Sequence, residues 1–473
     1  MRVELNVMKY EDGKVKELKI AYIGGGSMGW AWQLMSDLVS AEDISGAVNL
    51  YDIHYEAAQK NEIIGNKYND VEGAKSHWDY KAIRTIDEAL AGADFVIISI
   101  MPGTLDEMES DVHWPEKYGI YQSVGDTTGP GGIIRAMRTI PMFEFIANKI
   151  KENCPNAWVI NYTNPMTLCV RALYRTFPEI KAFGCCHEVF GTQKLLAELV
   201  AEKLGVDEIT REDIKVNPVS VNHFTWLTSA TYHDMDLFPI YEEFCREHPE
   251  GRDSHAGNNW MNNSFCSKEK VKIDLFRRFG YIAAAGDRHL AEFCEGKWYL
   301  ENPERVSEMC FGLTTTDFRR KDLEKRRLKS EGYISGEREL KIKQTGEEGV
   351  LQIRSLLGLC QLATNVNIPN RGQITNLPIG AVVETNALFR DNSLTPVFAG
   401  EIPIEIYPLV SRVCAEQELV SQGIAERDLK KIFCAFANDP LVTCSFEDAK
   451  RLFREMCDNT KEYLTMYDLE QEI

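Results

Sequence analysis

The chain has 473 residues, which is too long for a single small core, so we expect two or more large lobes. It carries 53 Lys and Arg residues against 72 Asp and Glu residues, a formal net charge of −19. This balance disfavours a general nucleic-acid-binding protein, which needs a basic face to replace counterions. Hydrophobic residues make up 44% and charged residues 26% of the chain, which rules out wholesale disorder.

The sequence has no signal for a membrane or for export. No run of roughly 18 apolar residues is present, so no membrane span is predicted. Residues 1–18 mix charged and apolar side chains and lack the apolar block of a secretion signal. The 13 cysteines are an odd number, and reduced thiols in the cytosol are the simplest interpretation. We therefore expect a cytoplasmic protein that binds neither membranes nor nucleic acids.

The N-terminal part alternates between strands and helices. Helices are predicted at 30–39, 86–91 and 133–151. Strands are predicted at 18–23, 47–51, 93–99, 157–161 and 181–185. Such alternation is typical of a parallel, doubly wound sheet. The fold class is therefore α/β, with an N-terminal Rossmann-type doubly wound parallel sheet in a domain of residues 1–204.

From about residue 205 the alternation fades, and helical and irregular segments dominate. Residues 216–231 are predicted to form more sheet. The charged run at 319–329 is most simply a solvated helix face. No linker separates the two parts, so the second lobe is expected to pack on the first. Residues 205–473 are thus predicted to be a mixed α+β domain for substrate binding and oligomerisation.

A glycine-rich loop follows the first predicted strand. Gly24, Gly26 and Gly29 have the GxGxxG spacing and open a predicted helix. The first glycine allows a tight turn, the second lets the backbone approach a pyrophosphate, and the third lets helix and strand pack closely. Asp52 ends the next strand, where it would bind ribose hydroxyls and repel a 2′-phosphate. The pattern predicts an NAD site; a plain glycine turn is the alternative.

A cysteine, a histidine and two asparagines near predicted strands are further candidate site residues. Cys186 follows a strand at the edge where open α/β sheets bind ligands, and His223 lies in the second candidate sheet. A thiolate and an imidazole can hold a divalent transition metal and leave positions open for a substrate diol. Spacing alone leaves open a purely packing role for Cys186. Asn161 and Asn164 flank a turn, and either a ligand contact or a simple Asn-Pro turn explains them.

Together these motifs resemble glycoside hydrolase family 4, the NAD- and metal-dependent glycosidases. The resemblance spans most of the chain, and its strength is the order of the motifs. They are Ile23-Gly24-Gly25-Gly26-Ser27 with Asp52, Thr127-Thr128-Gly129-Pro130-Gly131-Gly132 with Arg135 and Arg138, Asn161-Tyr162-Thr163-Asn164-Pro165, Cys186-His187-Glu188-Val189, Asn222-His223, and Val366-Asn367-Ile368-Pro369-Asn370-Arg371-Gly372 with Ile374 and Asn376-Leu377-Pro378.

The resemblance implies an oxidation–elimination route. NAD⁺ takes a hydride from C3 of the sugar, and a divalent metal, usually Mn²⁺, binds the C2 and C3 oxygens. The resulting ketone makes the C2 proton acidic, a base removes it, and the glycosidic oxygen leaves. Water then adds at C1 and the hydride returns to C3. The net reaction is hydrolysis by a retaining glycosidase, without net redox change.

The resemblance also implies residue roles. Cys186 and His223 would ligate the metal, and Asn164 would bind sugar hydroxyls. The base of the family is a tyrosine in the second lobe, matched best by Tyr281, for which a core tyrosine is the alternative. Arg278 and Arg288 are candidates to lower its pKa. The implied cofactor-binding residues are Gly24, Gly26, Ser27, Gly29, Asp52 and Asn161.

The segment around Cys186 indicates the substrate class. Cys186-His187-Glu188-Val189 resembles the uronic-acid-cleaving subgroup, in which His187 would act near the C4 hydroxyl or the leaving group. Phospho-sugar members carry an arginine where this chain has Met101. Arg288 and His289 would bind the uronate carboxylate, although a surface ion pair also explains Arg288.

The sequence therefore predicts an enzyme. The first hypothesis is an α-galacturonidase that releases terminal α-linked galacturonate from pectin-derived oligosaccharides, with NAD and Mn²⁺ as cofactors. The alternatives are an α-glucuronidase or α-galactosidase of the same family, an NAD-dependent oxidoreductase, and a non-catalytic NAD-binding sensor. By resemblance we expect a homo-oligomer, either a dimer or a tetramer.

Overall fold

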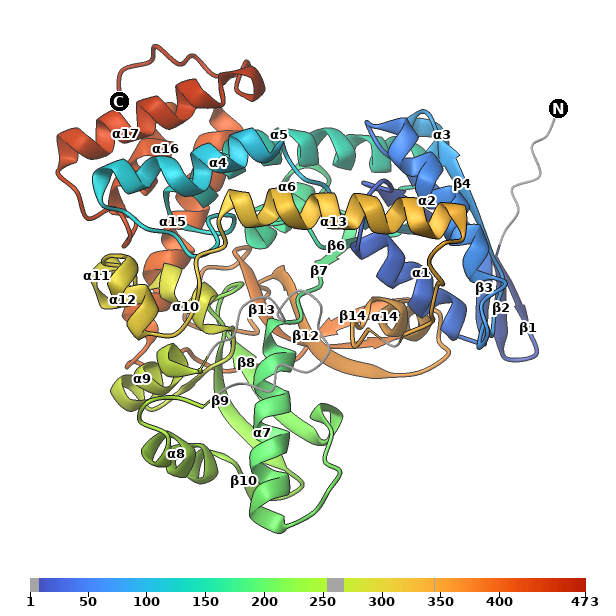
Figure 1. Cartoon of the computed structure of the whole chain (residues 1–473), viewed down its shortest axis with the longest axis horizontal. Coiled ribbons are helices and arrows are strands. Elements are labelled where there is room, and N and C mark those ends of the chain that lie inside the picture. The colour runs from blue at the N-terminus through green and yellow to red at the C-terminus, as the bar shows by residue number, and fades with distance from the viewer. Residues whose placement is uncertain (1–7, 253–267, 344) are drawn as a thin grey trace.

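The computed structural model describes residues 8–252, 268–343 and 345–473. Its centre is a parallel sheet in the order β4-β3-β2-β5-β6-β7 (Figure 1). In chain order this is 3-2-1-4-5-6, the arrangement of dinucleotide-binding folds. The predicted Rossmann-type sheet is confirmed, with β4 as a strand that the sequence did not reveal. The strands are β2 (Lys14–Ile23), β3 (Ile44–Tyr51), β4 (Trp78–Ile83), β5 (Phe95–Ile98), β6 (Trp158–Asn161) and β7 (Lys181–Gly184).

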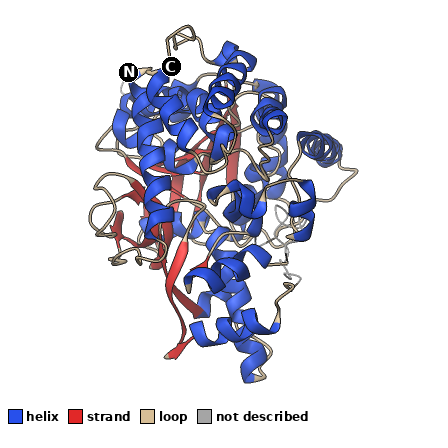
Figure 2. Cartoon of the chain, turned by 90° about the vertical axis from the view of Figure 1, so that its left-hand side faces the viewer, coloured by secondary structure: helices blue, strands red, loops and turns tan. Residues whose placement is uncertain are grey.

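The parallel strands are buried on both faces. Along β2, Ile20 and Tyr22 belong to one hydrophobic cluster, while Ala21 and Ile23 belong to the other. Helices α1 (Trp30–Ser40), α2 (Tyr55–Tyr68) and α14 (Gly349–Leu356) supply the first cluster. Helices α3 (Ile86–Leu90), α5 (Gly129–Asn153) and α6 (Met166–Thr176) supply the second. Figure 2 shows the helices on both sides of the sheet, as a continuous apolar strand pattern requires.

The sheet continues with strands from the C-terminal half of the chain. Asn367 of β12 pairs antiparallel with Gly184 of β7, and β13 and β14 follow in antiparallel order. These strands are β12 (Leu362–Pro369), β13 (Val382–Arg390) and β14 (Ser393–Pro396), while β1 (Lys9–Glu11) pairs with β2. One sheet is thus shared across residue 204, and the division into 1–204 and 205–473 stays a prediction.

A smaller antiparallel sheet lies below the large one in Figure 1 and confirms the sheet expected at 216–231. It consists of β8 (Ile214–Val219), β9 (Trp226–Tyr232), β10 (Met235–Asp236) and β11 (Ile282–Ala283). Three helices pack around it, α7 (Glu188–Leu204), α8 (Phe238–Glu247) and α9 (Lys270–Phe279). The turn between β8 and β9 carries His223, and α7 begins two residues after Cys186.

Four helices lie along the outer side of α5. They are α15 (Tyr407–Glu426), α16 (Leu429–Asn438) and α17 (Phe446–Asn459), with α4 (Leu105–His113) beside them. Shorter helices are α10 (Asp287–Phe293), α11 (Gly296–Tyr299) and α12 (Pro303–Glu308), with single turns η1 (Trp114–Tyr118), η2 (Arg211–Asp213) and η3 (Lys461–Tyr463). Among the described residues, no helix is both long and apolar enough to cross a membrane.

Helix α13 (Thr316–Ser335) crosses the molecule against α2 and α4 and contains the charged run (Figure 1). Most of its charged side chains are solvated, as the sequence predicts. Two arginines depart from that expectation. Arg326 donates to the carbonyl of Met28, 3.0 Å away, and Arg319 donates to the carbonyl of Val124, also at 3.0 Å. The inner face of this helix therefore reaches the loops at the carboxyl ends of the strands.

Candidate active site

The glycine loop between β2 and α1 leaves no room for side chains. Gly24 has φ +91°, and a Cβ there would lie 2.0 Å from the carbonyl oxygen of Ser99. A Cβ on Gly26 would lie 2.5 Å from that of Ala57. The N–H of Gly26 donates to Oδ2 of Asp52 over 2.9 Å, so the acid at the end of β3 also holds the loop.

Asn61 on α2 is a residue of this loop site that sequence reasoning missed. Its Nδ2 donates to the carbonyls of Gly25 at 2.8 Å and Ser27 at 3.0 Å, and its Oδ1 accepts from Trp32 Nε1 at 2.8 Å. A lone buried amide on an amphipathic helix has no sequence signature. It fixes the carbonyls of the loop, while the N–H groups of residues 24–27 donate to Tyr51, Asp52 and Gly24.

These residues fit a dinucleotide. Gly29 stands at the N-terminus of α1 with φ +142°, and within the described residues no side chain caps this helix. Free N–H groups at a helix N-terminus attract a phosphate. Asp52 is partly exposed beside them, where its carboxylate can accept from ribose hydroxyls. Asn161, by contrast, uses its side-chain amide on the backbone of Thr163, so its role toward a cofactor stays a prediction.

The second part of the site is a buried cluster around Cys186 and His223. Cys186 lies just beyond β7, and the side chain of Asn222 forms a hydrogen bond with its thiol. His223 follows Asn222 in the chain, and its Nδ1 lies 3.3 Å from the hydroxyl of Thr127. Thr127 belongs to the loop before α5 that the resemblance had singled out. The fold therefore brings three distant segments to one point.

Glu188 lies at the centre of the cluster. Its Oε1 is 3.7 Å from Nε2 of His187 and 3.6 Å from Nε2 of His289. The rings of His223 and His289 are 4.3 Å apart between centroids. Burial alone would raise the pKa of Glu188, but His289, His187, His223 and Arg288 together hold it well below its usual range. The structure thus gathers Cys186, His187, His223, Arg288 and His289 around an acid whose role the sequence did not assign.

A carboxylate from the antiparallel strands braces this cluster. Glu384 on β13 is buried and accepts hydrogen bonds from Thr225, Asn222 and Asn365. Asn365 also donates to the carbonyl of Cys186 over 3.2 Å. Glu384 therefore fixes the neighbours of both predicted metal ligands, which is how outer residues orient ligands. No motif marks it, because its partners come from other parts of the chain.

The donor set fits a divalent transition metal. Burial lowers the pKa of His223, so its imidazole is neutral, the form that ligates a metal. Burial, with Glu384 and Glu188 nearby, raises the pKa of the Cys186 thiol, and a cation acts in the opposite direction. Within the described ranges, no group of three or more His, Cys, Asp or Glu side chains is arranged around a common metal position. Cys186 and His223 would therefore leave coordination positions to a substrate.

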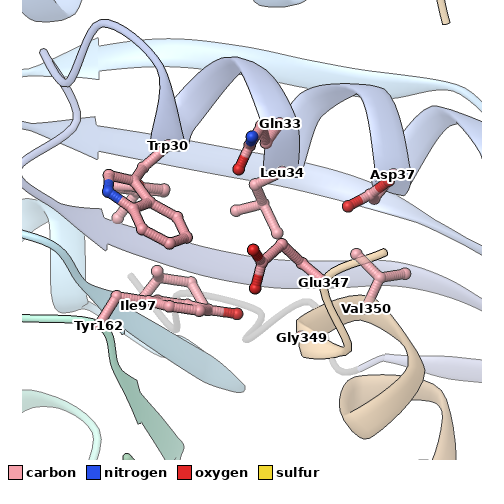
Figure 3. A pocket seen from close by; sticks show the side chains of 10 residues that line it. Trp30, Gln33, Leu34, Asp37, Ile97, Tyr162, Glu347, Gly349 and Val350 are labelled. Atoms are coloured by element: carbon pink, nitrogen blue, oxygen red, sulfur yellow. The ribbon is translucent and has the colours of Figure 1, made fainter. Parts of the chain in front are cut away.

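Glu347 lines a cavity between α1 and α14 (Figure 3). Its Oε1 lies 3.4 Å from Nδ1 of His187, and its other oxygen has no hydrogen-bond partner among the described residues. Trp30, Tyr162 and Asp37 line the same space, which measures about 310 Å³ up to open solvent. Burial raises the pKa of Asp37 to about 7, against hydrogen bonds from Thr345.

Asn164 and Tyr281 are two further residues that the sequence predicts for the site. Oδ1 of Asn164 is buried without a partner in the described part of the chain, as expected of a group kept for a ligand, while its carbonyl accepts from Arg135. Tyr281 follows α9 and packs its ring 6.4 Å from Phe238. Burial and Glu405 raise its pKa, the direction opposite to that needed by a base. The catalytic role of Tyr281 stays a prediction.

Comparison with known proteins identifies the family. The family 4 glycosyl hydrolase profile matches residues 19–202, and the profile of the family 4 C-terminal domain matches residues 219–442. The chain belongs to glycosyl hydrolase family 4. This confirms the resemblance inferred from the ordered motifs, and it makes the protein a glycoside hydrolase.

Four curated relatives above 50% identity share one name. Four bacterial α-galacturonidases are 52–61% identical over 93–97% of this chain. That from Thermoanaerobacterium saccharolyticum is 61% identical over 97% of this chain and 98% of its own. A crystal structure of a Bacillus subtilis protein described as a glucosidase has a TM-score of 0.88 at 52% identity, covering 93% of this chain and all of the other. A 6-phospho-α-glucosidase in complex with NAD and Mn²⁺, from gut microorganisms, has a TM-score of 0.76 at 20% identity, covers 94% of this chain and 99% of its own, and shares the fold.

Proposed function

We propose that this family 4 enzyme hydrolyses terminal α-linked galacturonides and that it uses NAD and Mn²⁺. The observation that carries the proposal is the identity of 52–61%, over nearly the whole chain, with four α-galacturonidases. The site agrees with this substrate class, since Arg288 and His289 stand beside Glu188 in the same cluster as Cys186. A cationic side chain there suits a sugar that carries a carboxylate.

The chain's own residues have separable tasks. When bound, NAD supplies a reversible hydride acceptor and Mn²⁺ a Lewis acid for two neighbouring sugar oxygens. The glycine loop, Asp52 and the N-terminus of α1 would hold the dinucleotide. Cys186 and His223 would hold the metal, with Glu384 keeping their neighbours in place. The unpartnered Oδ1 of Asn164 would accept a hydrogen bond from a sugar hydroxyl.

Glu188 would orient the histidines beside it and balance their charge. Glu188 lies within 4 Å of both His187 and His289, so it can orient either imidazole toward a sugar oxygen. His187 is held from its other side by Glu347, which fixes the direction of its ring. We place His187 next to the leaving group or the C4 hydroxyl. The buried position of the cluster excludes bulk water, which strengthens every charge interaction within it.

The test is a panel of chromogenic α-D-glycosides. The enzyme is given NAD⁺, Mn²⁺ and a reducing thiol, and release of nitrophenol from the galacturonide, glucuronide and galactoside is measured. We expect the galacturonide to react at least about tenfold faster than either neighbour, since loss of a charge-assisted contact or a misplaced hydroxyl costs that much. A faster glucuronide or galactoside would overturn the substrate assignment.

The same assay separates a hydrolase from an oxidoreductase. Absorbance of NADH is followed while nitrophenol is released. We expect many turnovers without accumulation of NADH, because the hydride returns to the sugar. Stoichiometric NADH with no glycosidic cleavage would instead establish a dehydrogenase.

We further propose a cytoplasmic location and a homo-oligomeric state. Every cysteine within the described ranges is free, which suits a reducing compartment. Fractionation of the producing cells should recover the enzyme with cytoplasmic markers, and light scattering should give a mass of two or four chains. A periplasmic or secreted pool, or a monomer mass, would contradict these two statements respectively.

A further inference from the structure

Three arginines converge on one acid beside the Cys186 cluster. Arg135, Arg288 and Arg319 come from α5, α10 and α13, three helices far apart in the sequence. Burial alone would raise the pKa of Asp126, but Arg135 and Arg319, followed by His289, lower it below its usual value. Arg319 also lowers the pKa of Arg288, after burial and against Glu188. The guanidinium groups are therefore close enough to oppose one another.

One nitrogen of the Arg319 guanidinium group has a hydrogen-bond partner, and another has none among the described residues. It lies in the first turns of α13, and Nη2 donates to the carbonyl of Val124 over 3.0 Å. Its Nε is buried and has no hydrogen-bond partner in the described part of the chain. A buried N–H donor without a partner is costly, and a ligand oxygen would satisfy it. A planar guanidinium fixed at one corner presents its remaining donors in a direction that a carboxylate can meet.

One loop connects Arg319 and Arg288 to the predicted metal ligand. Ser123 donates to the backbone carbonyl of Arg288, and its own carbonyl accepts from the N–H of Thr314 at 2.7 Å. Nη1 of Arg288 lies 3.5 Å from the hydroxyl of Thr314. Val124, the next residue of this loop, anchors Arg319. Residues 123–124 thus contact both arginines, Arg288 through its backbone and Arg319 through its guanidinium group.

The loop then runs directly to the cluster. The hydroxyl of Thr127 donates to Asp126 over 2.8 Å and lies 3.3 Å from Nδ1 of His223. Arg319 is therefore linked to the predicted metal ligand by Val124, Asp126 and Thr127. In a pyranose the C5 substituent lies across the ring from the C2 and C3 oxygens, so a sugar bound through those oxygens would need a separate partner for its carboxylate.

Buried acids and arginines lie side by side around this position. Arg135, Arg288 and Arg319 face Asp126 and Glu188. Burial, with Asp126 and Asp439 nearby, raises the pKa of Glu292 to about 8, so this third acid is mostly protonated at pH 7. The neighbouring Asp111 is matched by its own buried partner, Arg138.

We propose that Arg319, together with Arg288, binds the C6 carboxylate of the substrate and sets the preference for a uronic acid over a neutral hexose. The inference rests on the proposed α-galacturonidase function and names the residue pair responsible for its specificity. The sequence suggested a solvated helix face for Arg319, and its inward contact with Val124 is what assigns it to the site.

The experiment compares nitrophenyl α-D-galacturonide with its methyl ester, which is the same sugar without the charge. Wild type and Arg319→Gln are assayed on both substrates, and inhibition by free D-galacturonate is measured. For Arg319→Gln we expect kcat/KM on the acid to fall roughly 10–100-fold and the inhibition constant of galacturonate to rise by a similar factor, because one charge-assisted contact is lost. The rate on the methyl ester should change less than about threefold.

Arg320→Gln is the matched control on the same helix. Arg320 lies at the surface, where it pairs with Asp106 and Glu109. This variant loses the same charge, and we expect no change in either substrate or in galacturonate inhibition. Thermal midpoint and NAD titration are measured for both variants, so that a folding defect is recognised.

The outcomes separate the two proposals. An equal loss on acid and ester, an unchanged inhibition constant, or a selective loss of NAD binding in Arg319→Gln would overturn the role of Arg319. A wild-type enzyme that ignores the galacturonide would refute the proposed function itself, whatever the variant does. A collapse of the acid-to-ester preference in Arg319→Gln alone would establish the inference.

Discussion

The two halves of the site are assembled in different ways. The glycine loop, Asp52 and Asn61 lie within 40 residues of one another, and their contacts are mostly between side chains and backbone. The cluster around Glu188 draws on α7, the β8–β9 turn, α10 and β13, and several of its contacts join side chain to side chain. The first half depends on local backbone conformation, and the second depends on the packing of the whole chain.

This difference has a functional consequence. A site formed by glycines and a helix N-terminus recognises a phosphate-linked dinucleotide of general shape. A site of buried charged groups from several elements recognises one arrangement of sugar oxygens. Substitutions in the two halves should therefore impair different steps, and the variants below test that separation.

The largest effect is expected for Cys186→Ser. The thiolate is the soft ligand of the pair, and loss of the metal removes several kcal/mol of stabilisation from the reacting sugar. Turnover of the galacturonide should fall by at least about 1000-fold, while NAD affinity stays within a factor of about two. The two quantities are measured by nitrophenol release and by fluorescence titration.

Cys185→Ser is the matched control for this variant. Cys185 is equally buried but bonds with Tyr162 and Gln352 instead of the cluster. It should keep Mn²⁺ binding and most of its activity. Full activity in Cys186→Ser, or loss of Mn²⁺ in both variants alike, would contradict the ligand assignment.

Glu384→Gln should weaken metal binding without touching NAD. One oxygen that accepts hydrogen bonds becomes an NH₂ group that faces donors, so Asn222 or Asn365 must move. Outer residues of this kind change metal affinity roughly 10–100-fold. Titration with Mn²⁺, followed by paramagnetic resonance, measures the effect, with the exposed Glu401→Gln as control. An unaltered Mn²⁺ affinity would show that the hydrogen bonds to Glu384 are not needed for metal binding.

Asp52→Ala should affect only the half of the site that binds the dinucleotide. It removes an acceptor for the ribose and the bond to the N–H of Gly26. We expect roughly tenfold weaker NAD binding and a reduced preference for NAD over NADP, because the charge that repels a 2′-phosphate is gone. Mn²⁺ affinity should be unchanged. Equal losses of NAD and Mn²⁺ affinity would mean that the two halves are not separable.

The smallest effect on the reaction is expected for Asp37→Asn, on the inner side of α1. Burial raises the pKa of Asp37 to about 7, above the value near 3.9 of an unfolded aspartate. The folded state therefore binds the extra proton, and its stability contribution is complete below about pH 4 and is lost as the pH rises through about 7. Asparagine does not titrate, so the Asp37→Asn variant does not lose this stability as the pH rises.

The measurement is the thermal and denaturant stability of the two proteins at pH 5 and pH 8. Relative to wild type, Asp37→Asn should gain on the order of 2 kcal/mol in unfolding free energy between these pH values, with turnover unchanged. The exposed Asp70→Asn has the same charge change and should show no such gain. A stability difference that is independent of pH would refute the buried, raised-pKa state of Asp37.

Local patterns predicted the first half well. Gly24, Gly26 and Gly29 with Asp52 follow from the strand–loop–helix order, and the sheet that carries them was expected. The strand β4 was missed although Trp78–Ile83 alternates buried and exposed side chains, because the strands of a parallel sheet were sought as continuous hydrophobic runs. The shared strands β12 and β13 were missed as well, because nothing local shows that a strand near residue 365 pairs with one near residue 184.

The second half was predictable only in part. Cys186, His187, His223, Arg288 and His289 were named, chiefly through the resemblance, and the structure brings them together. Glu384 and Arg319 were not, because a buried acid in a strand and an arginine in a charged run look ordinary in sequence. Tyr281 was named from a short match, and its role as a base stays a prediction.

The most direct test of the central claim is hydrolysis in D₂O. The account requires that a proton leave C2 of the sugar before the glycosidic bond breaks, and that solvent return one afterwards. Nuclear magnetic resonance of the released galacturonate should therefore show deuterium at C2. Product formed over many turnovers with only hydrogen at C2 would indicate direct displacement and would contradict the account.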